Sequence, residues 1–180
     1  MTRLPPVLSE LDLPLPELLA ARLDGELFAQ DAAFTPIDEI ESIQHRIRAV
    51  HTGRPDRLIA EQHSAAWIWG AMPFPPSHHQ LCVTLGARVQ HRATAPIREV
   101  VIDDHEIVSV EGLLVTAPLR TAVDLARFSP AFGQLEETIV AFLMRHHGFG
   151  TADCLGELER RRNLPGKRRA VQRLSPLAAR

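Results

Sequence analysis

Apolar residues recur along the chain in two patterns, and one stretch shows both patterns in succession. Residues 113–116 form a short apolar run that is typical of a strand. Pro118 then stands where a first helical residue belongs, because its missing N–H and fixed φ cost nothing there. The next apolar residues are spaced i, i+3, i+4 and i+7, at Leu119, Ala122, Val123 and Ala126. The pattern predicts a strand that leads into a helix over 118–127, whose other face carries Arg120, Thr121, Asp124 and Arg127.

The region before this stretch is predicted to begin with two helices separated by extended chain. A short helix is expected over 17–23, and a short strand over 26–29. A second helix is expected over 38–52, with Asp38 as its N-cap and Glu41 completing a variant of the capping box. Its buried stripe would be Ile40, Ile43, Ile47 and Val50.

The middle of the chain is predicted to supply most of a sheet. Apolar runs predict strands over the ranges 57–61, 80–85, 97–102, 106–110 and 113–116. The last two flank Glu111-Gly112, which is a hairpin signal. A helix rich in small residues is expected over 63–70, with Ser64 as its N-cap, and a polar connection over 86–96.

The rest of the chain is predicted to be helical. Ser129-Pro130 is typical of an N-cap and first helical residue, and it predicts a helix over 130–147. Thr151 is expected to N-cap a helix that runs to 162, and a last short helix covers 167–174. With strands in the centre and helices at both ends, the fold class is α+β: a central mixed, largely antiparallel sheet with packed helices and a helical C-terminal segment.

Composition and charge narrow the class of protein. The 180 residues are 45% hydrophobic, which supports a packed core, and no apolar run is long enough to span a membrane. The N-terminus has no continuous apolar stretch of the kind a signal peptide needs, so we expect a cytoplasmic protein. Cys82 and Cys154 have no nearby cysteine partners, which argues against a disulfide framework or a zinc knuckle.

The C-terminal segment is strongly basic although the whole chain carries a net charge of −2. Residues 157–180 hold eight basic and two acidic groups. Such a cluster indicates either a solvated face or contact with an anionic partner. The candidate nucleic-acid-binding residues are Arg160, Arg161, Arg162, Lys167, Arg168 and Arg169. No aromatic residues alternate with them, so binding to DNA is expected to be weak, non-specific and sensitive to salt.

The motifs that carry common enzyme chemistry are missing from the sequence. It has no glycine-rich phosphate loop and no HExxH. His78-His79 and His146-His147 are adjacent pairs whose side chains diverge, whereas zinc needs three or four convergent ligands. Asp103-Asp104 is predicted to form a turn rather than part of a carboxylate site. We therefore expect no enzyme, no catalytic residue, no metal site and no cofactor.

Arg120 is the polar residue that most needs an explanation. It falls in the first turn of its predicted helix, where the helix dipole disfavours a cation by roughly 0.3–1 kcal/mol. Asp124 follows at i+4 and can also reach Arg127. One interpretation is an ion-pair chain that fixes the helix to a neighbouring element, so that Arg120 finds a carboxylate within the fold. The other is that Arg120 binds a partner's acidic group or a phosphate.

Three stretches resemble a known family. Residues 57–61, 64–71 and above all 115–127, which read VTAPLRTAVDLAR, are similar to the AbiEi-type antitoxins of type IV toxin–antitoxin systems, in the form common in actinobacteria. The resemblance covers roughly residues 15–175. It implies an N-terminal winged helix that binds promoter DNA and represses its own operon. It also implies a C-terminal domain that counters a nucleotidyltransferase-like toxin.

The resemblance also suggests how the chain is divided. Residues 1–37 would be the acidic remnant of a truncated winged-helix-like module, 38–150 an α+β antitoxin-like core, and 151–180 a basic helical segment. Some longer relatives end in a Vsr-like endonuclease domain, but this chain ends about where that domain would begin, so no nuclease activity is expected.

Two hypotheses about function follow. The first is a non-enzymatic antitoxin-like or regulatory protein whose partner is a nucleotidyltransferase-like toxin. The alternative is a DNA-binding transcriptional regulator that uses the basic C-terminal helices. Neither involves a membrane, and the sequence predicts no oligomeric state.

Overall fold

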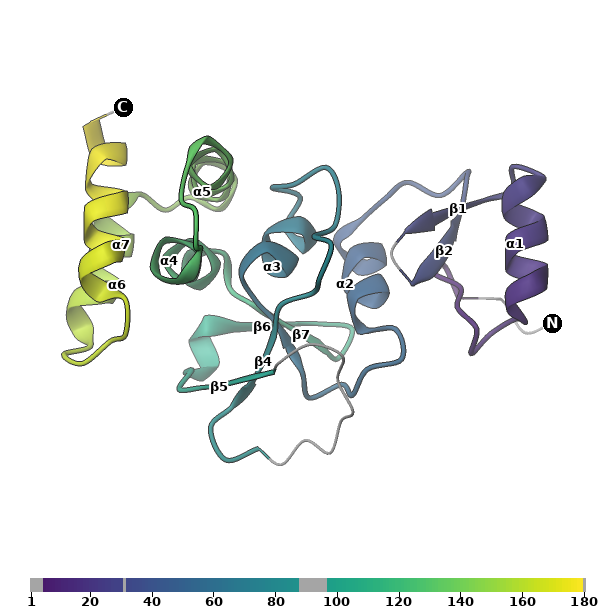
Figure 1. Cartoon of the computed structure of the whole chain (residues 1–180), viewed down its shortest axis with the longest axis horizontal. Coiled ribbons are helices and arrows are strands. Elements are labelled where there is room, and N and C mark those ends of the chain that lie inside the picture. Colours follow the sequence, from purple (N-terminus) through teal and green to yellow (C-terminus); the bar gives the residue numbers. More distant parts are fainter. Residues whose placement is uncertain (1–4, 31, 88–96, 180) are drawn as a thin grey trace.

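A small mixed sheet lies at the centre of the molecule, with helices on either side of it (Figure 1). The computed structural model describes residues 5–30, 32–87 and 97–179. Figure 1 shows the N-terminal elements at one end and the C-terminal helices at the opposite end. The predicted polar connection over 86–96 falls mostly on 88–96, which lie outside the described residues.

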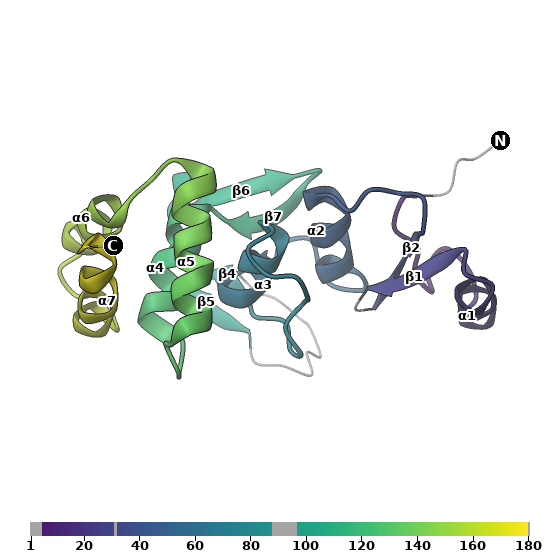
Figure 2. The same ribbon diagram turned by 90° about the horizontal axis from the view of Figure 1, so that it is seen from above.

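The N-terminal elements are a helix and a hairpin. Helix α1 (Leu15–Leu23) precedes the antiparallel strands β1 (Leu27–Gln30) and β2 (Ala33–Pro36). Leu18 is buried and packs in a small apolar cluster with Leu8 and Phe34. Figure 2 shows this group beside α2 at the end of the molecule far from α6 and α7. The predicted order of helix, turn and strand is therefore present in the structure.

The central sheet has the strand order β5-β4-β3-β7-β6. Its strands are β3 (Ile59–Ala60), β4 (Leu81–Thr84), β5 (Arg98–Val100), β6 (Ile107–Val110) and β7 (Leu113–Thr116). Strand β3 is antiparallel to β4 and parallel to β7, while β5 is parallel to β4 and β6 is antiparallel to β7. The prediction of an α+β fold with a mixed sheet is thus confirmed. The strands over 57–61 and 97–102 are shorter than predicted.

Two helices pack on the sheet, and four more lie beyond them. They are α2 (Ile43–His51), α3 (Gln62–Ile68), α4 (Pro118–Phe128), α5 (Gln134–His147), α6 (Thr151–Arg160) and α7 (Lys167–Leu174), with 3-10 turns η1 (Asp104–Glu106) and η2 (Ser175–Ala179). Helices α2 and α3 contact β7, and α4 lies between α3 and the group α5, α6 and α7 (Figure 1). One apolar cluster surrounds Trp67, and a second joins α4 to α5, α6 and α7 through Leu125, Ile139 and Leu158. Helix α4 is consequently buried on nearly every side.

Several local predictions are confirmed by the backbone. Glu111 and Gly112 have φ values of 53° and 85°, the pair of positive values that a two-residue hairpin turn requires. Pro118 is the first residue of α4. Gly148 ends α5 with a φ of 69°. These signals are carried by residues next to the turn or helix end that they specify, so no distant contact overrides them.

Helix α2 begins later than its capping pattern predicts. Its N-cap is Ser42, whose hydroxyl accepts the His45 N–H, rather than Asp38. Glu41 is used instead by Arg46, with Nη2 of the arginine 2.7 Å from Oε2, and by the side-chain amide of Gln30. Ile40 is left 87% exposed outside the helix. Glu41 thus contacts Arg46 and Gln30 instead of completing the predicted capping box.

Three further N-caps differ from the prediction. Helix α5 starts at Gln134 rather than Pro130, because the Ser129 N–H still bonds to the Leu125 carbonyl and the Ser129 hydroxyl donates to Glu136. The predicted capping residues Ser64 and Thr151 both lie inside their helices, whose N-caps are Glu61 and Gly150. The predicted ends of these helices were therefore wrong by one to four residues, although each helix is present.

Candidate functional site

The geometry of α4 places three charged side chains in the interior of the protein. Pro118 starts the helix directly after β7, so its first turn lies against η1 and its later turns against α6 and α7. Arg120, Asp124 and Arg127 are spaced i, i+4 and i+7 and so share one face. That face is covered: Arg120 and Arg127 are each 4% exposed, and Asp124 is 0% exposed.

These side chains form a continuous chain of ion pairs. Asp124 accepts at Oδ2 from Nε of Arg120 at 2.7 Å and at Oδ1 from Nη1 of Arg127 at 2.6 Å. Nη1 of Arg120 lies 2.8 Å from Oε2 of Glu106. The same Glu106 oxygen lies 2.7 Å from Nη2 of Arg161, which also contacts Oδ2 of Asp103 at 2.7 Å. The chain of charges links η1, α4 and the residue that follows α6.

Burial and charge act in opposite directions on these groups. Burial alone would lower the pKa of Arg120, but Asp124 and Glu106 outweigh it and raise that pKa above its ordinary value. Burial alone would raise the pKa of Glu106, but the Asp103 N–H together with Arg120 and Arg161 holds it below its ordinary value. Arg120 and Glu106 therefore both favour their charged forms, and each offsets the burial of the other's charge.

Some contacts of this network can be predicted from the sequence, and others cannot. The contact between Arg120 and Asp124 follows from their spacing, and the structure contains it. Glu106 was missed, although Asp103 and Glu106 have the Asp-x-x-Glu spacing of a capping box, which the structure also forms. Arg161 was expected among the nucleic-acid-binding residues, but it turns inward because Glu106 is buried beneath it.

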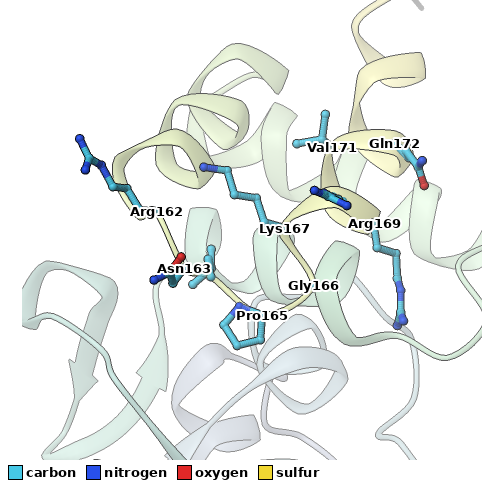
Figure 3. A pocket seen from close by; sticks show the side chains of 10 residues that line it. Arg162, Asn163, Pro165, Gly166, Lys167, Arg169, Val171 and Gln172 are labelled. Carbon is cyan, nitrogen blue, oxygen red and sulfur yellow. The ribbon is translucent and has the colours of Figure 1, made fainter.

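The remaining basic residues of that set lie around the turn between α6 and α7. Arg162, Lys167, Arg168 and Arg169 line an open hollow of about 880 Å³. Figure 3 shows its wall: Arg162, Asn163 and Pro165 come from the turn, while Lys167 and Arg169 come from the start of α7. No acidic side chain lines the hollow among the described residues. Arg160 lies on α6, where its 73% exposed side chain pairs with Glu157 at 2.9 Å. The hollow is therefore a cationic surface open to a partner.

The polar groups that most resemble a catalytic set are tied into the fold. The Ser64 hydroxyl lies 3.1 Å from Nδ1 of His79 and accepts the Gln80 N–H at 2.9 Å. Ser64 is fully buried, so a substrate has no access to it. His63 pairs with Glu136 at 3.3 Å and connects α3 to α5. These contacts hold α3 against the chain before β4 and against α5.

The described ranges contain neither a metal-binding cluster nor a membrane-spanning helix. No cluster of three or more His, Cys, Asp or Glu side chains there could hold a metal ion. Within the same ranges, none of the helices has the length and apolar character needed to cross a bilayer.

Comparison with known proteins identifies a family for this chain. The family model for the AbiEi antitoxin C-terminal domain matches residues 58–177, which include the central sheet, the ion-pair network and the basic hollow. No curated protein matches the chain. Because this model covers two thirds of the sequence, the chain belongs to the AbiEi antitoxin family through its C-terminal domain.

Proposed function

We propose that the protein is a non-enzymatic antitoxin-like or regulatory protein that acts in the cytoplasm by binding a partner, without a cofactor. The observation that carries the proposal is that the antitoxin family model spans an open cationic hollow. The partner on this proposal is a nucleotidyltransferase-like toxin with an acidic surface. Electrostatic complementarity would steer the encounter and fix the orientation of the two proteins.

The ion-pair network has a supporting role in this proposal. Arg127 donates from Nε to the Pro165 carbonyl at 2.9 Å, which ties α4 to the turn that forms one wall of the hollow. Arg120, Asp124 and Arg127 would then hold the surface in place rather than touch the partner. We further propose that residues 1–37 are a separate remnant of a winged-helix-like module, since α1 and the β1–β2 hairpin have their own apolar cluster.

The test is binding of a candidate toxin by variants of the hollow. Arg168→Glu with Arg169→Glu reverses two charges there, and it should weaken binding at least about tenfold. The control is Arg22→Glu with Arg145→Glu, which reverses two exposed charges on α1 and α5. Binding would be measured by titration calorimetry with the nucleotidyltransferase-like protein encoded nearest the gene, together with rescue of toxin-inhibited growth. The proposed role of the hollow is contradicted if both double variants lose the same affinity for the toxin, or if the Arg168→Glu, Arg169→Glu variant still binds it tightly.

A second candidate function is DNA binding by the same hollow. It is favoured by four cationic side chains with no acidic neighbour among the described lining residues. Fluorescence anisotropy with a duplex from the upstream region, at several salt concentrations, tests it. Four phosphate contacts predict a slope of log K against log salt no steeper than about −4. A salt-independent signal, or none, excludes this function.

A further inference from the structure

A second cavity, distinct from the basic hollow, is lined by arginines from three parts of the chain. It has a volume of about 550 Å³ and lies between β5, α4 and the turn after α6. Its charged and aromatic lining residues are Arg98, Glu99, Arg120, Arg127, Phe128 and Arg161. A cavity of this size is typical of sites that take a small organic molecule.

Buried carboxylates that do not line the cavity orient three of these arginines. Arg98 donates from Nε and Nη2 to the two oxygens of Glu61, at 2.8 and 2.6 Å. Asp124 accepts one bond from Arg120 and one from Arg127. Glu61 and Asp124 are at most 1% exposed, and neither lines the cavity. The guanidinium groups are therefore fixed in position before anything binds.

Each of these three arginines keeps unused donors. A guanidinium has five N–H groups. Nη1 of Arg98, Nη2 of Arg120 and Nη2 of Arg127 make no hydrogen bond or ion pair with the described residues. Nη1 of Arg120 is also buried without an aligned hydrogen bond, although Glu106 is 2.8 Å away. Because these arginines line the cavity, an acceptor bound there can take up their unused donors.

The aromatic ring and the charge balance further define the ligand. The guanidinium carbons of Arg98 and Arg127 lie 4.1 and 4.3 Å from the centre of the Phe128 ring, so this ring spaces the two cations. The buried carboxylates already balance most of the positive charge, and Glu99 adds a negative charge to the lining. A polyanion such as a nucleic acid is therefore disfavoured. The remaining lining includes Val100, Val101 and Leu164, which suit an apolar body.

We propose that this cavity binds a small organic molecule that carries a single oxyanion group, a carboxylate or a phosphate monoester, on an apolar body. The oxyanion accepts from the unused donors of Arg98, Arg120 and Arg127, and the body packs against Val101 and Leu164. The site shares Asn163, Leu164 and Pro165 with the basic hollow but none of its cationic side chains, so it does not depend on the proposed function.

The test uses phenyl phosphate, benzoate, inorganic phosphate and phenol as probes in titration calorimetry with the whole chain. Phenyl phosphate or benzoate should bind at one site per chain, and whichever is tighter identifies the head group. Phenol should bind at least about tenfold more weakly because it lacks the oxyanion, and inorganic phosphate because it lacks the apolar body. No binding of either organic anion, or equal binding of inorganic phosphate, overturns the proposal.

Two variants locate the site. Arg98→Gln with Glu61→Gln replaces the buried ion pair by a neutral pair, which avoids stranding a charge, and should weaken the tighter probe at least about tenfold. The control is Arg48→Gln with Glu111→Gln, the same change at an exposed pair with a 2.6 Å contact. Val101→Trp fills the cavity from an exposed position without removing a charge and should also abolish binding. Thermal unfolding confirms that each variant is folded. Unchanged affinity in the folded Val101→Trp variant places the probe elsewhere.

Discussion

Arg120 donates from Nε to Asp124 at 2.7 Å even though it precedes this carboxylate on the helix, the weaker order for an i,i+4 pair. The pair nevertheless stabilises the fold, because both groups are buried and because Arg127 binds the other oxygen of the same carboxylate. A buried network of this kind is costly to break from the middle, since loss of one member leaves the others without a counter-charge.

Asp124→Asn should therefore destabilise the protein by about 3–5 kcal/mol, because it leaves two buried guanidinium groups without their shared carboxylate. Chemical denaturation followed by circular dichroism measures the change. Asp104→Asn makes the same substitution at an exposed residue and should cost less than about 0.5 kcal/mol. Similar stability of the two variants would show that Asp124 is not central to the network.

Gly166→Ala should be more harmful than Gly25→Ala. Both glycines have a φ of 77°, so both substitutions carry a backbone cost of about 1–2 kcal/mol. A Cβ at Gly166 would also lie 2.9 Å from the Arg127 carbonyl oxygen, whereas in the described structure a Cβ at Gly25 meets nothing within 4 Å. We expect Gly166→Ala to cost at least about 1 kcal/mol more in unfolding free energy. Equal costs would mean that α4 and the turn are not in close contact.

Acidification should weaken the fold through His51 before the carboxylates titrate. Burial lowers the pKa of His51, which lies under β7 with its Nε2 3.1 Å from the Leu114 carbonyl. The unfolded chain then takes up a proton near pH 6.5 that the folded state resists, so stability is lost as the pH falls below that value. His51→Gln should reduce the loss of unfolding free energy between about pH 7.5 and 5.5.

The comparison for this prediction is His78→Gln, which changes an exposed histidine in the loop before β4. It should leave the pH dependence as it is in the unmodified chain. If the His51 variant shows the full acid-induced loss, protonation of His51 does not cause it.

Both cysteines should be unreactive in the folded protein. Cys82 and Cys154 are fully buried, and burial raises the pKa of both thiols, that of Cys154 to about 12. Because the thiolate is the reactive form, an aromatic disulfide reagent at pH 8 should react at least about a hundredfold more slowly than in denaturant. Rapid release of one equivalent of thiolate from the folded chain would show that one of the two sites opens.

The parts of the fold that the sequence predicts well are those fixed by neighbouring residues. The hairpin at Glu111-Gly112 and the start of α4 at Pro118 depend on backbone preferences within a few residues. The start of α2 was predicted wrongly: Asp38 and Glu41 have the spacing of a capping box, but Glu41 contacts Arg46 and, across the turn before α2, Gln30. Tertiary contacts of this kind are not visible in local spacing.

The candidate site likewise contains some contacts that can be predicted from the sequence and others that cannot. Asp124 is reachable from Arg120 along one helix, so its contact could be predicted. Arg98 and Glu61 are 37 residues apart, and Arg161 and Glu106 are 55 apart. The order of the strands brings the first pair together, and the packing of the chain after α6 against η1 brings the second pair together. The arginine-lined cavity could not be predicted, because it is formed where three such distant segments meet.

The turn formed by Asn163, Leu164 and Pro165 lines both the basic hollow and the arginine-lined cavity. It acts as a partition between two compartments, and the Arg127 contact to Pro165 anchors it from one side. Any occupant that shifts this partition changes the shape of the other compartment. By thermodynamic reciprocity, a small acid that alters the affinity for a protein partner must have its own affinity altered by the same factor. If both proposed sites are occupied, the partition would therefore couple binding of the small acid to binding of the protein partner.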